Sequence, residues 1–271
     1  MSVSEVTTPW RHAVVQTVPR DHRARAEELA SMSLWPPGWS DGRTRLTAYT
    51  VFIDGTRLVR VFDLEPMGSD VPQDAEDAWS RFLASALAEL DEVARAEAEA
   101  LLLCGTGATT SSRAGTADAL ARASVPAFAG RITPLEALPG TGVRERALLR
   151  YPVLPGRGAQ VQAALSGRPD LPVRATSRTA LASTSLFREG DLVLRLVEVA
   201  GDLADGFAHL RATASRGPAA QDLVSHLREG FDLRTNEGFD RFLASGRLRR
   251  LAYERLRDIP ATASSPRGKT P

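Results

Sequence analysis

The chain has 271 residues, of which 43% are hydrophobic and 25% are charged, and its 34 basic side chains nearly balance 33 acidic ones. This composition is that of an ordinary globular protein and excludes a disordered, collagen-like or coiled-coil chain. The net charge of +1 lacks the basic excess of a nucleic-acid-binding protein. The single cysteine, Cys104, excludes an internal disulfide framework and a multi-cysteine zinc site.

Targeting and membrane signals are also missing from the sequence. No apolar run approaches the roughly 20 residues that span a bilayer. The first residues, MSVSEVTTPWRH, lack the basic start and apolar core of a signal peptide. We therefore expect a cytoplasmic protein with neither a membrane nor a nucleic-acid partner. Residues 1–9 and 259–271 are polar or rich in Pro, Ser and Thr, and they are expected to form flexible tails.

Two similar segments lie 135 residues apart and carry the clearest pattern in the chain. Residues 51–64 read VFIDGTRLVRVFDL, and residues 186–199 read LFREGDLVLRLVEV. In register, Gly55 falls on Gly190, and each glycine follows an acidic residue. Each segment predicts a β-hairpin with an acidic-glycine turn, because glycine supplies the positive φ that such a turn needs.

The similarity continues on both sides of the hairpins and predicts the same order of elements in each half. A strand, a turn at proline and a helix precede each hairpin. Helices are expected after the hairpins at 74–82 and 202–210, further helices at 218–229 and 236–245, and closing strands at 100–104 and 247–256. The resulting order, β-α-β-β-α-β, is that of the ferredoxin-like unit.

These elements predict an α+β fold in which two fused ferredoxin-like repeats form an intramolecular dimeric α+β barrel. Each four-stranded sheet carries helices on one face only, so a second sheet is needed to cover the other face. We expect the first repeat over 10–105, a linker rich in Gly, Thr and Ser over 106–143, and the second repeat over 144–258.

Arg60 and Arg195 occupy the same place in the two hairpins and are the first catalytic candidates. Strand alternation puts Arg60 on one face with Leu58 and Phe62, and Asp63 on the other. A guanidinium on an otherwise apolar strand face needs a partner. Each arginine therefore either forms a salt bridge across the barrel or holds the phenolate or enolate oxygen of a substrate.

His12 and His209 are the candidate general bases, because imidazole titrates near neutral pH. The alternative for each is an ordinary surface or capped histidine. No pair of histidines has metal-ligand spacing, so no metal is predicted. We also expect no other cofactor, since the sequence carries no flavin or haem motif and its G-x-G at 105–107 lacks the third glycine of a dinucleotide loop.

Aromatic side chains provide the candidate substrate contacts. A proline-containing loop, SLWPPGWSDG, precedes the second strand and either plugs one end of the barrel or forms a lid that stacks on a flat aromatic substrate. Strand tyrosines are either hydrogen-bonded core residues or donors to a pocket. The candidate substrate-binding residues are Trp35, Trp39, Tyr49, Trp79, Tyr151 and Phe207.

The segment FREGDLVLRLVEVAGDLADGFAHL, the following PAAQDLVSHL helix and the closing FLASGRLRRL resemble the SchA/CurD-like family. Members accompany type II polyketide synthases of actinomycetes, in clusters for spore pigments and related polycyclic aromatics, and often carry two copies of the domain. The resemblance implies a tailoring enzyme, a cofactor-independent oxygenase that hydroxylates a polycyclic aromatic intermediate or converts it to a quinone. A polyketide cyclase or aromatase of the same fold, and a non-catalytic partner of the synthase complex, are the alternatives.

The resemblance also implies the partners and the working half. The expected partners are an aromatic polyketide small molecule and other tailoring proteins of the synthase, with the chain acting as a monomer or homodimer. We place the working pocket in the second half, where the resemblance is closest, with Arg195 as the cation and His209 as the base.

Overall fold

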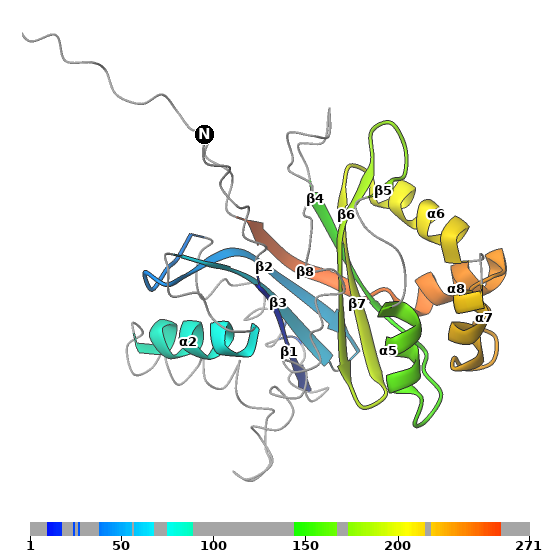
Figure 1. Ribbon diagram of the computed structural model, residues 1–271, viewed down its shortest axis with the longest axis horizontal. Helices are drawn as coiled ribbons and strands as arrows, with labels where there is room; N and C mark the ends of the chain where they lie inside the picture. The colour runs from blue at the N-terminus through cyan, green and yellow to red at the C-terminus, as the bar shows by residue number, and fades with distance from the viewer. Residues whose placement is uncertain are drawn as a thin grey trace, which may run out of the picture.

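The computed structural model describes residues 10–17, 24, 27, 38–55, 57–67, 75–88, 144–166, 173–214 and 218–255. They form a mixed α+β structure with two four-stranded antiparallel sheets (Figure 1), which confirms the predicted α+β class. The predicted tails, the linker over 106–143 and the closing strand at 100–104 lie outside the described residues.

The two sheets have matching strand orders, β1-β3-β2-β8 and β4-β7-β6-β5. The strands are β1 (Trp10–Thr17), β2 (Thr44–Asp54), β3 (Arg57–Pro66), β4 (Arg144–Arg150), β5 (Val173–Arg174), β6 (Ala180–Glu189), β7 (Leu192–Ala200) and β8 (Arg249–Arg255). The helices are α2 (Ala75–Ala88), α5 (Gly158–Ser166), α6 (Leu203–Ala214), α7 (Pro218–Ser225) and α8 (Asn236–Gly246). In both halves the first strand pairs with the second strand of the hairpin, so the halves share a topology.

Both predicted hairpins are confirmed, as β2–β3 and β6–β7. Their turns contain Gly55 at φ 56° and Gly190 at φ 54°. A Cβ atom added at either glycine would meet nothing within 4 Å, so the backbone conformation rather than space requires glycine.

The predicted helices after the two hairpins and the helix before the second hairpin are also confirmed, with ends displaced by a few residues, whereas the helix predicted before the first hairpin lies almost entirely outside the described residues. The largest difference is α2, which continues to Ala88, six residues beyond the predicted end, whereas α7 stops at Ser225, four residues before its predicted end. The start of α8 has a local cause, because the Thr235 hydroxyl accepts a hydrogen bond from the Gly238 N–H at 3.0 Å. None of the described helices is long and apolar enough to cross a membrane.

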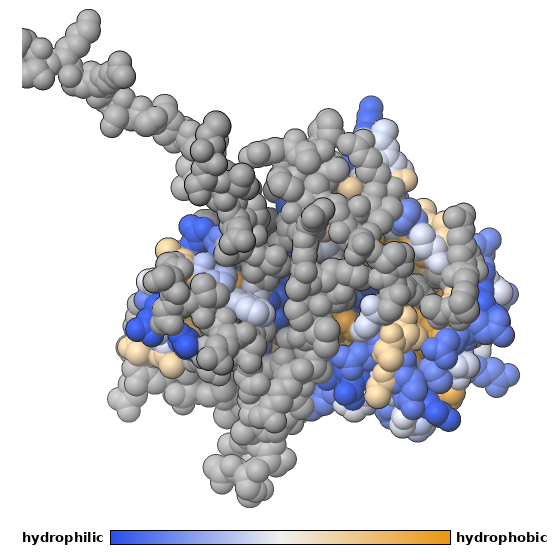
Figure 2. Space-filling view, viewed as in Figure 1, coloured by the Kyte–Doolittle hydropathy of each residue, from blue (hydrophilic) through white to orange (hydrophobic). Residues whose placement is uncertain are grey.

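Three apolar clusters fix the layers of the molecule. One lies between the first sheet and α2, and another lies between the second sheet and α5, α6, α7 and α8. The third contains side chains of both sheets, such as Phe52 and Val61 from the first and Phe187 and Leu196 from the second. The sheets therefore pack face to face with helices outside (Figure 1), and hydrophilic residues dominate the visible surface over the second-half helices (Figure 2).

The closing strand of the second half corrects the sequence prediction. Residues 247–256 are predicted to complete the second sheet, and Arg247 does form a bridge with Leu149 of β4. The Leu248 N–H also donates to the Leu148 carbonyl at 2.9 Å. Beyond this point the chain leaves β4, and β8 pairs with β2 of the first sheet (Figure 1).

The apolar side chains of β8 explain this choice of neighbour. Leu251 and Ala252 pack against the apolar cluster under the first sheet. β2 also offers a backbone edge, which β8 covers from Ala48 to Ile53. One segment thus touches both sheets, and the description as two complete ferredoxin-like repeats is not confirmed. The predicted domain boundaries stay a prediction.

Candidate functional site

Two acidic residues at equivalent places in the hairpins face the space between the sheets. Asp63 of β3 and Glu198 of β7 are 135 residues apart in the sequence. Strand alternation puts each of them on the face opposite Arg60 or Arg195. Asp63 is 3% exposed and Glu198 is 1% exposed, so both carboxylates depend on protein partners rather than on water.

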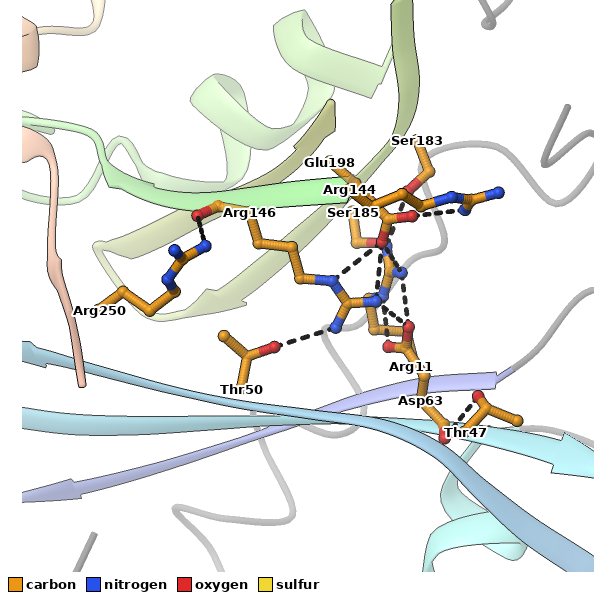
Figure 3. A network of polar contacts seen from close by, with 10 residues as sticks. All are labelled: Arg11, Thr47, Thr50, Asp63, Arg144, Arg146, Ser183, Ser185, Glu198 and Arg250. Atoms are coloured by element: carbon orange, nitrogen blue, oxygen red, sulfur yellow. Dashed lines mark hydrogen bonds and ion pairs between the residues drawn. The ribbon is translucent and has the colours of Figure 1, made fainter. Parts of the chain in front are cut away.

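Two arginines bind these carboxylates, and each contacts the carboxylate of its own sheet and that of the other sheet (Figure 3). Arg11 of β1 holds Asp63 in a two-pronged contact, from Nε to Oδ1 at 2.7 Å and from Nη2 to Oδ2 at 2.8 Å. Arg146 of β4 donates from Nε to Glu198 Oε2 at 2.9 Å. Each arginine also reaches the carboxylate of the opposite sheet, Arg146 to Asp63 and Arg11 to Glu198.

Hydroxyl groups complete an approximate twofold symmetry in this buried ion network. Arg146 Nη1 donates to Thr50 Oγ1 of the first sheet at 3.1 Å. Arg11 Nη1 donates to Ser185 Oγ of the second sheet at 3.0 Å. Thr50 and Ser185 are 135 residues apart, as are Arg11 and Arg146. The network is therefore a duplicated feature in which each half supplies the arginine that reaches the other half's hydroxyl.

A third arginine joins the buried ion network at Glu198. Arg144 Nη1 contacts Glu198 Oε1 at 2.6 Å, and its place in the first half holds Pro9. Of the residues that the structure describes, three guanidiniums thus meet two carboxylates. Burial alone opposes ionisation of Asp63, but the guanidiniums of Arg11 and Arg146 hold its pKa below the ordinary 3.8. The Asp63 carboxylate is therefore ionised throughout the neutral pH range.

Sequence analysis does not single out Arg11, Arg144 or Arg146. The available signal is the 135-residue repeat, which relates Arg11 to Arg146 just as it relates the two acidic residues of the network. A strand pairing is also needed, because Arg11 lies directly opposite Asp63 in the register of β1 and β3.

The predicted catalytic arginines lie on the helix-covered faces of the sheets, not between the sheets. Arg60 is 1% exposed, next to the apolar cluster under α2. Arg195 is also buried, and its Nε donates to Thr184 Oγ1 at 2.8 Å. The predicted salt bridge across the barrel is therefore wrong for both, because alternation turns them outward. Arg11 and Arg146 form that bridge instead, to Glu198 and Asp63 of the opposite sheets.

The predicted bases have different surroundings. His12 of β1 is completely buried, and this burial lowers the pKa of its imidazole to about 3. The ring is therefore neutral at pH 7 and only a weak base. His209 is half-buried on α6. Among the described residues, no group of His, Cys, Asp and Glu side chains is arranged to hold a metal ion.

The predicted aromatic contacts divide between the two outer clusters. In the first half, Trp39 meets Phe82 edge-on with ring centroids 5.0 Å apart, and Tyr49 packs on Phe62 at 5.1 Å. Trp35 lies outside the described residues, and Trp79 lies in α2 with its side chain also outside them.

The second half holds the remaining aromatic candidates. Tyr151 packs on Phe242 with ring centroids 5.0 Å apart. The guanidinium of Arg247 lies over the ring of Phe207, 5.4 Å from its centroid. The structure thus groups His12, Arg60, Trp39 and Tyr49 under the first sheet, and Arg195, Tyr151 and Phe207 under the second. It does not bring the two groups together.

A cleft of about 360 Å³ opens where the turns of the two hairpins meet, and we call it the hairpin cleft. It is lined by Arg57, Arg150, Tyr151, Pro152, Val153, Pro155, Asp191, Leu192, Arg228, Phe231, Ser245 and Gly246. Arg57 and Leu192 occupy equivalent places in the two hairpins. An ion pair between Arg150 and Asp54, at 2.7 Å, joins β4 to the turn of the first hairpin beside the cleft.

Hydrogen bonds fix the wall of the hairpin cleft. The Asp191 carboxylate accepts from the N–H groups of Gly156 at 2.7 Å and Gly158 at 3.0 Å, and these bonds lower its pKa. It thereby ties the second hairpin to the start of α5. The Arg228 N–H donates to the Pro152 carbonyl at 2.8 Å. The cleft therefore has a wall that hydrogen bonds hold in place, and three guanidiniums are among its lining residues.

Close backbone contact at Gly158 gives a test of this wall. A Cβ atom at Gly158 would lie 1.9 Å from the carbonyl oxygen of Gly190. Gly158→Ala is expected to lower the free energy of unfolding by at least about 1–3 kcal/mol, because the backbone of the turn must move away. Thermal unfolding measures the loss, with Ala159→Ser at an exposed neighbouring position as the control. Equal melting temperatures for the two variants would contradict the close packing.

Two solved structures align with nearly the whole chain. The crystal structure of an anthrone oxidase-like protein covers 96% of this chain and 98% of its own, with 12% identity and a TM-score of 0.32. A putative monooxygenase from Lactobacillus acidophilus covers 92% of this chain and 96% of its own, with 9% identity and a TM-score of 0.29. Superpositions this loose carry no argument about function.

Sequence comparison is more informative about the second half. Residues 144–254 match the family described as SchA/CurD like domain. The "42.8 kDa protein in whiE locus" of Streptomyces coelicolor is 31% identical over 231 residues, which cover 82% of this chain and 52% of that protein. The chain thus spans about half the length of this curated relative. The second half of the chain is thus similar to the SchA/CurD like domain, as the sequence resemblance predicts.

Proposed function

We propose that the protein is a tailoring enzyme of aromatic polyketide biosynthesis, and that it oxidises a polycyclic phenol in the hairpin cleft without a cofactor. The SchA/CurD-like domain and the relative named for the whiE locus support the biosynthetic role. The observation that carries the chemistry is the lining of the hairpin cleft, which combines apolar and aromatic side chains with three guanidiniums and one carboxylate, that of Asp191.

The hairpin cleft suits a flat, weakly acidic ligand. Its volume of about 360 Å³ lies within the range of small-molecule sites. Tyr151 and Phe231 offer aromatic surface, on which a polycyclic ring system packs favourably. Arg57, Arg150 and Arg228 supply positive charge for a phenolate or enolate oxygen. Ionisation of the substrate is the step that these cations favour.

The proposed reaction needs a base, a cation and dioxygen. In an anthrone-type substrate, the base removes a proton from the ring CH₂ group, and the resulting enolate passes electrons to dioxygen as a carbon–oxygen bond forms. Loss of water then leaves a carbonyl, so CH₂ and O₂ become C=O and H₂O. The substrate itself is the reductant.

We propose Glu189, at the end of β6, as the base: it does not line the hairpin cleft itself, but it lies two residues from Asp191 and interacts with the charge of Arg57, both of which line the cleft. Burial raises the pKa of the Glu189 carboxyl, against the opposing effect of the Arg57 guanidinium. A raised pKa makes a carboxylate a stronger base near neutral pH. Arg195 and His209 do not line the hairpin cleft, so their predicted catalytic roles stay predictions.

Oxygen uptake with anthrone, without added flavin or NADPH, tests the proposed function. We expect turnover to a quinone, and a fall in kcat/KM of about 10²-fold in Arg150→Ala and Arg228→Ala, because each variant removes a cation from the site of developing charge. Arg211→Ala is the matched control, since it removes an exposed arginine of α6 that does not line the cleft.

Other outcomes separate the alternatives. If a poly-β-ketone gives new ring patterns without oxygen uptake, the protein is a cyclase and not an oxygenase. If polycyclic phenols are neither turned over nor bound, the assignment of the hairpin cleft is overturned.

A further inference from the structure

A second cleft, of about 380 Å³, lies on the far side of β4, and we call it the edge cleft. It is lined by Glu145, Arg146, Ala147, Leu203, Arg247, Leu248, Arg249 and Arg250. Four guanidiniums therefore meet one carboxylate. No residue is shared with the hairpin cleft, so the two sites can be tested separately.

The path of the chain after α8 creates the edge cleft. β4 is the edge strand of the second sheet, and the segment before β8 meets it only at Leu148 and Leu149. β8 then crosses to the first sheet. The outer edge of β4 from Arg144 to Ala147 therefore has no strand neighbour among the described residues, and the diverging segment 247–250 carries three arginines past it.

Contacts inside the protein place the arginines of the edge cleft. The Arg247 guanidinium lies over Phe207 and makes no hydrogen bond to any residue that the structure describes. Arg249 Nη2 meets Glu27 at 2.6 Å. Arg250 Nη1 points to the Arg146 carbonyl at 3.5 Å (Figure 3). Two of these guanidiniums thus keep most of their donor groups for a ligand.

Tyr253 of β8 does not line the edge cleft itself but contacts two arginines that do. The guanidiniums of Arg146 and Arg250 both lie over its ring, 5.1 and 5.6 Å from the centroid. Its hydroxyl is buried and has no hydrogen-bond partner among the described residues. A buried hydroxyl without a partner is costly unless a ligand or water satisfies it.

We propose that the edge cleft binds the phosphate group of a small organic ligand. Arg146 is ion-paired with Asp63 and Glu198 and Arg249 with Glu27, whereas Arg247 and Arg250 have no carboxylate partner among the described residues, so the lining offers two uncompensated guanidiniums beside the Glu145 carboxylate. A dianionic phosphate matches these two guanidiniums better than a monoanionic phenolate or carboxylate does. Guanidinium groups also bind phosphate oxygens in pairs.

The apolar part of the edge cleft favours an organic phosphate over the free ion. Ala147, Leu203 and Leu248 line the cleft beside the arginines, and its volume exceeds what a phosphate ion fills. An apolar group attached to the phosphate would cover these side chains. The relative affinities for inorganic phosphate and phenyl phosphate therefore distinguish a site for the free ion from a site for an organic phosphate.

Isothermal titration calorimetry of the full chain tests the proposal, with phenyl phosphate, inorganic phosphate and benzoate as probes at fixed ionic strength. We expect phenyl phosphate to bind most tightly and benzoate at least tenfold more weakly. Arg247→Ala and Arg250→Ala should each weaken phenyl phosphate binding at least tenfold, and Tyr253→Phe several-fold. Arg211→Ala, which removes the same charge elsewhere, should leave binding unchanged.

Three results would overturn the proposal: no binding of either phosphate, equal affinity for benzoate and phenyl phosphate, or equal weakening by Arg211→Ala and Arg247→Ala. Tighter binding of inorganic phosphate than of phenyl phosphate would assign the cleft to the free ion and exclude the organic ligand. Because Arg247 is exposed, its alanine variant is expected to fold, and an unchanged melting temperature confirms this. Oxygen uptake in the same variants reports separately on the hairpin cleft.

Discussion

Asp63→Asn is expected to lower the free energy of unfolding by about 3–5 kcal/mol at pH 7, the typical effect of breaking a buried ion pair from one side. The substitution keeps the shape of the side chain but leaves three buried guanidiniums with one carboxylate among the described residues. Urea unfolding measures the loss. Asp240→Asn is the matched control, because that carboxylate is exposed and its contact with Arg211 is 3.4 Å long, so its loss should cost less than about 1 kcal/mol.

The pH dependence of the same comparison identifies the carboxylate as the cause. The folded-state pKa of Asp63 lies below 3.8, so its contribution is complete above the unfolded pKa and is lost as the pH falls through the folded pKa. The difference in unfolding free energy between the wild type and Asp63→Asn should therefore be constant from about pH 7 to pH 5 and shrink in more acidic solution. A difference below 1 kcal/mol at pH 7, or one that does not change with acid, would contradict this account.

A chain that ends at residue 248 is expected to lose the first sheet while keeping the sequence of every first-half strand. It lacks β8, which pairs with β2 from Ala48 to Ile53 and covers part of the first apolar cluster. Each lost backbone hydrogen bond contributes about 1 kcal/mol, so the total loss is several kcal/mol. A chain that ends at residue 258 keeps β8 and is the control. Hydrogen exchange of the β2 amides, followed by mass spectrometry, compares the two.

Fast exchange in the chain ending at 248 and slow exchange in the chain ending at 258 is the expected result. Equal protection of β2 in both chains would show that β8 adds nothing to the first sheet.

Much of the fold follows from local sequence patterns. The two hairpins are predictable because alternating apolar residues and an acidic-glycine turn are local features, and Gly55 and Gly190 have the positive φ that the turns require. The helices are predictable for the same reason. The neighbour of β8 is not, because an alternating pattern identifies a strand without saying which edge it joins.

The candidate site is also predictable only in its local features. Alternation correctly puts Asp63 on the face opposite Arg60, but it does not say which face meets the other sheet. The prediction takes the face that carries Arg60 and Arg195 to meet the other sheet, and so gives these arginines a role across the barrel that they do not have. Both clefts are assembled from segments far apart in the sequence, so only Tyr151 among the predicted site residues lines either of them. Spacing in one sequence gives no measure of such distances.

The crossed pattern of the buried ion network limits how the two halves can diverge. After a duplication, each copy is ordinarily free to accumulate changes while the other keeps its role. Here the Thr50 hydroxyl accepts from Arg146, and the Ser185 hydroxyl accepts from Arg11, so neither half contains all the partners of its own polar groups. The outer helix-covered faces can specialise independently, whereas residues at the centre must be inherited as matched pairs. A hybrid that combines one half of this chain with the other half of a relative should therefore fold only when these central pairs are transferred together.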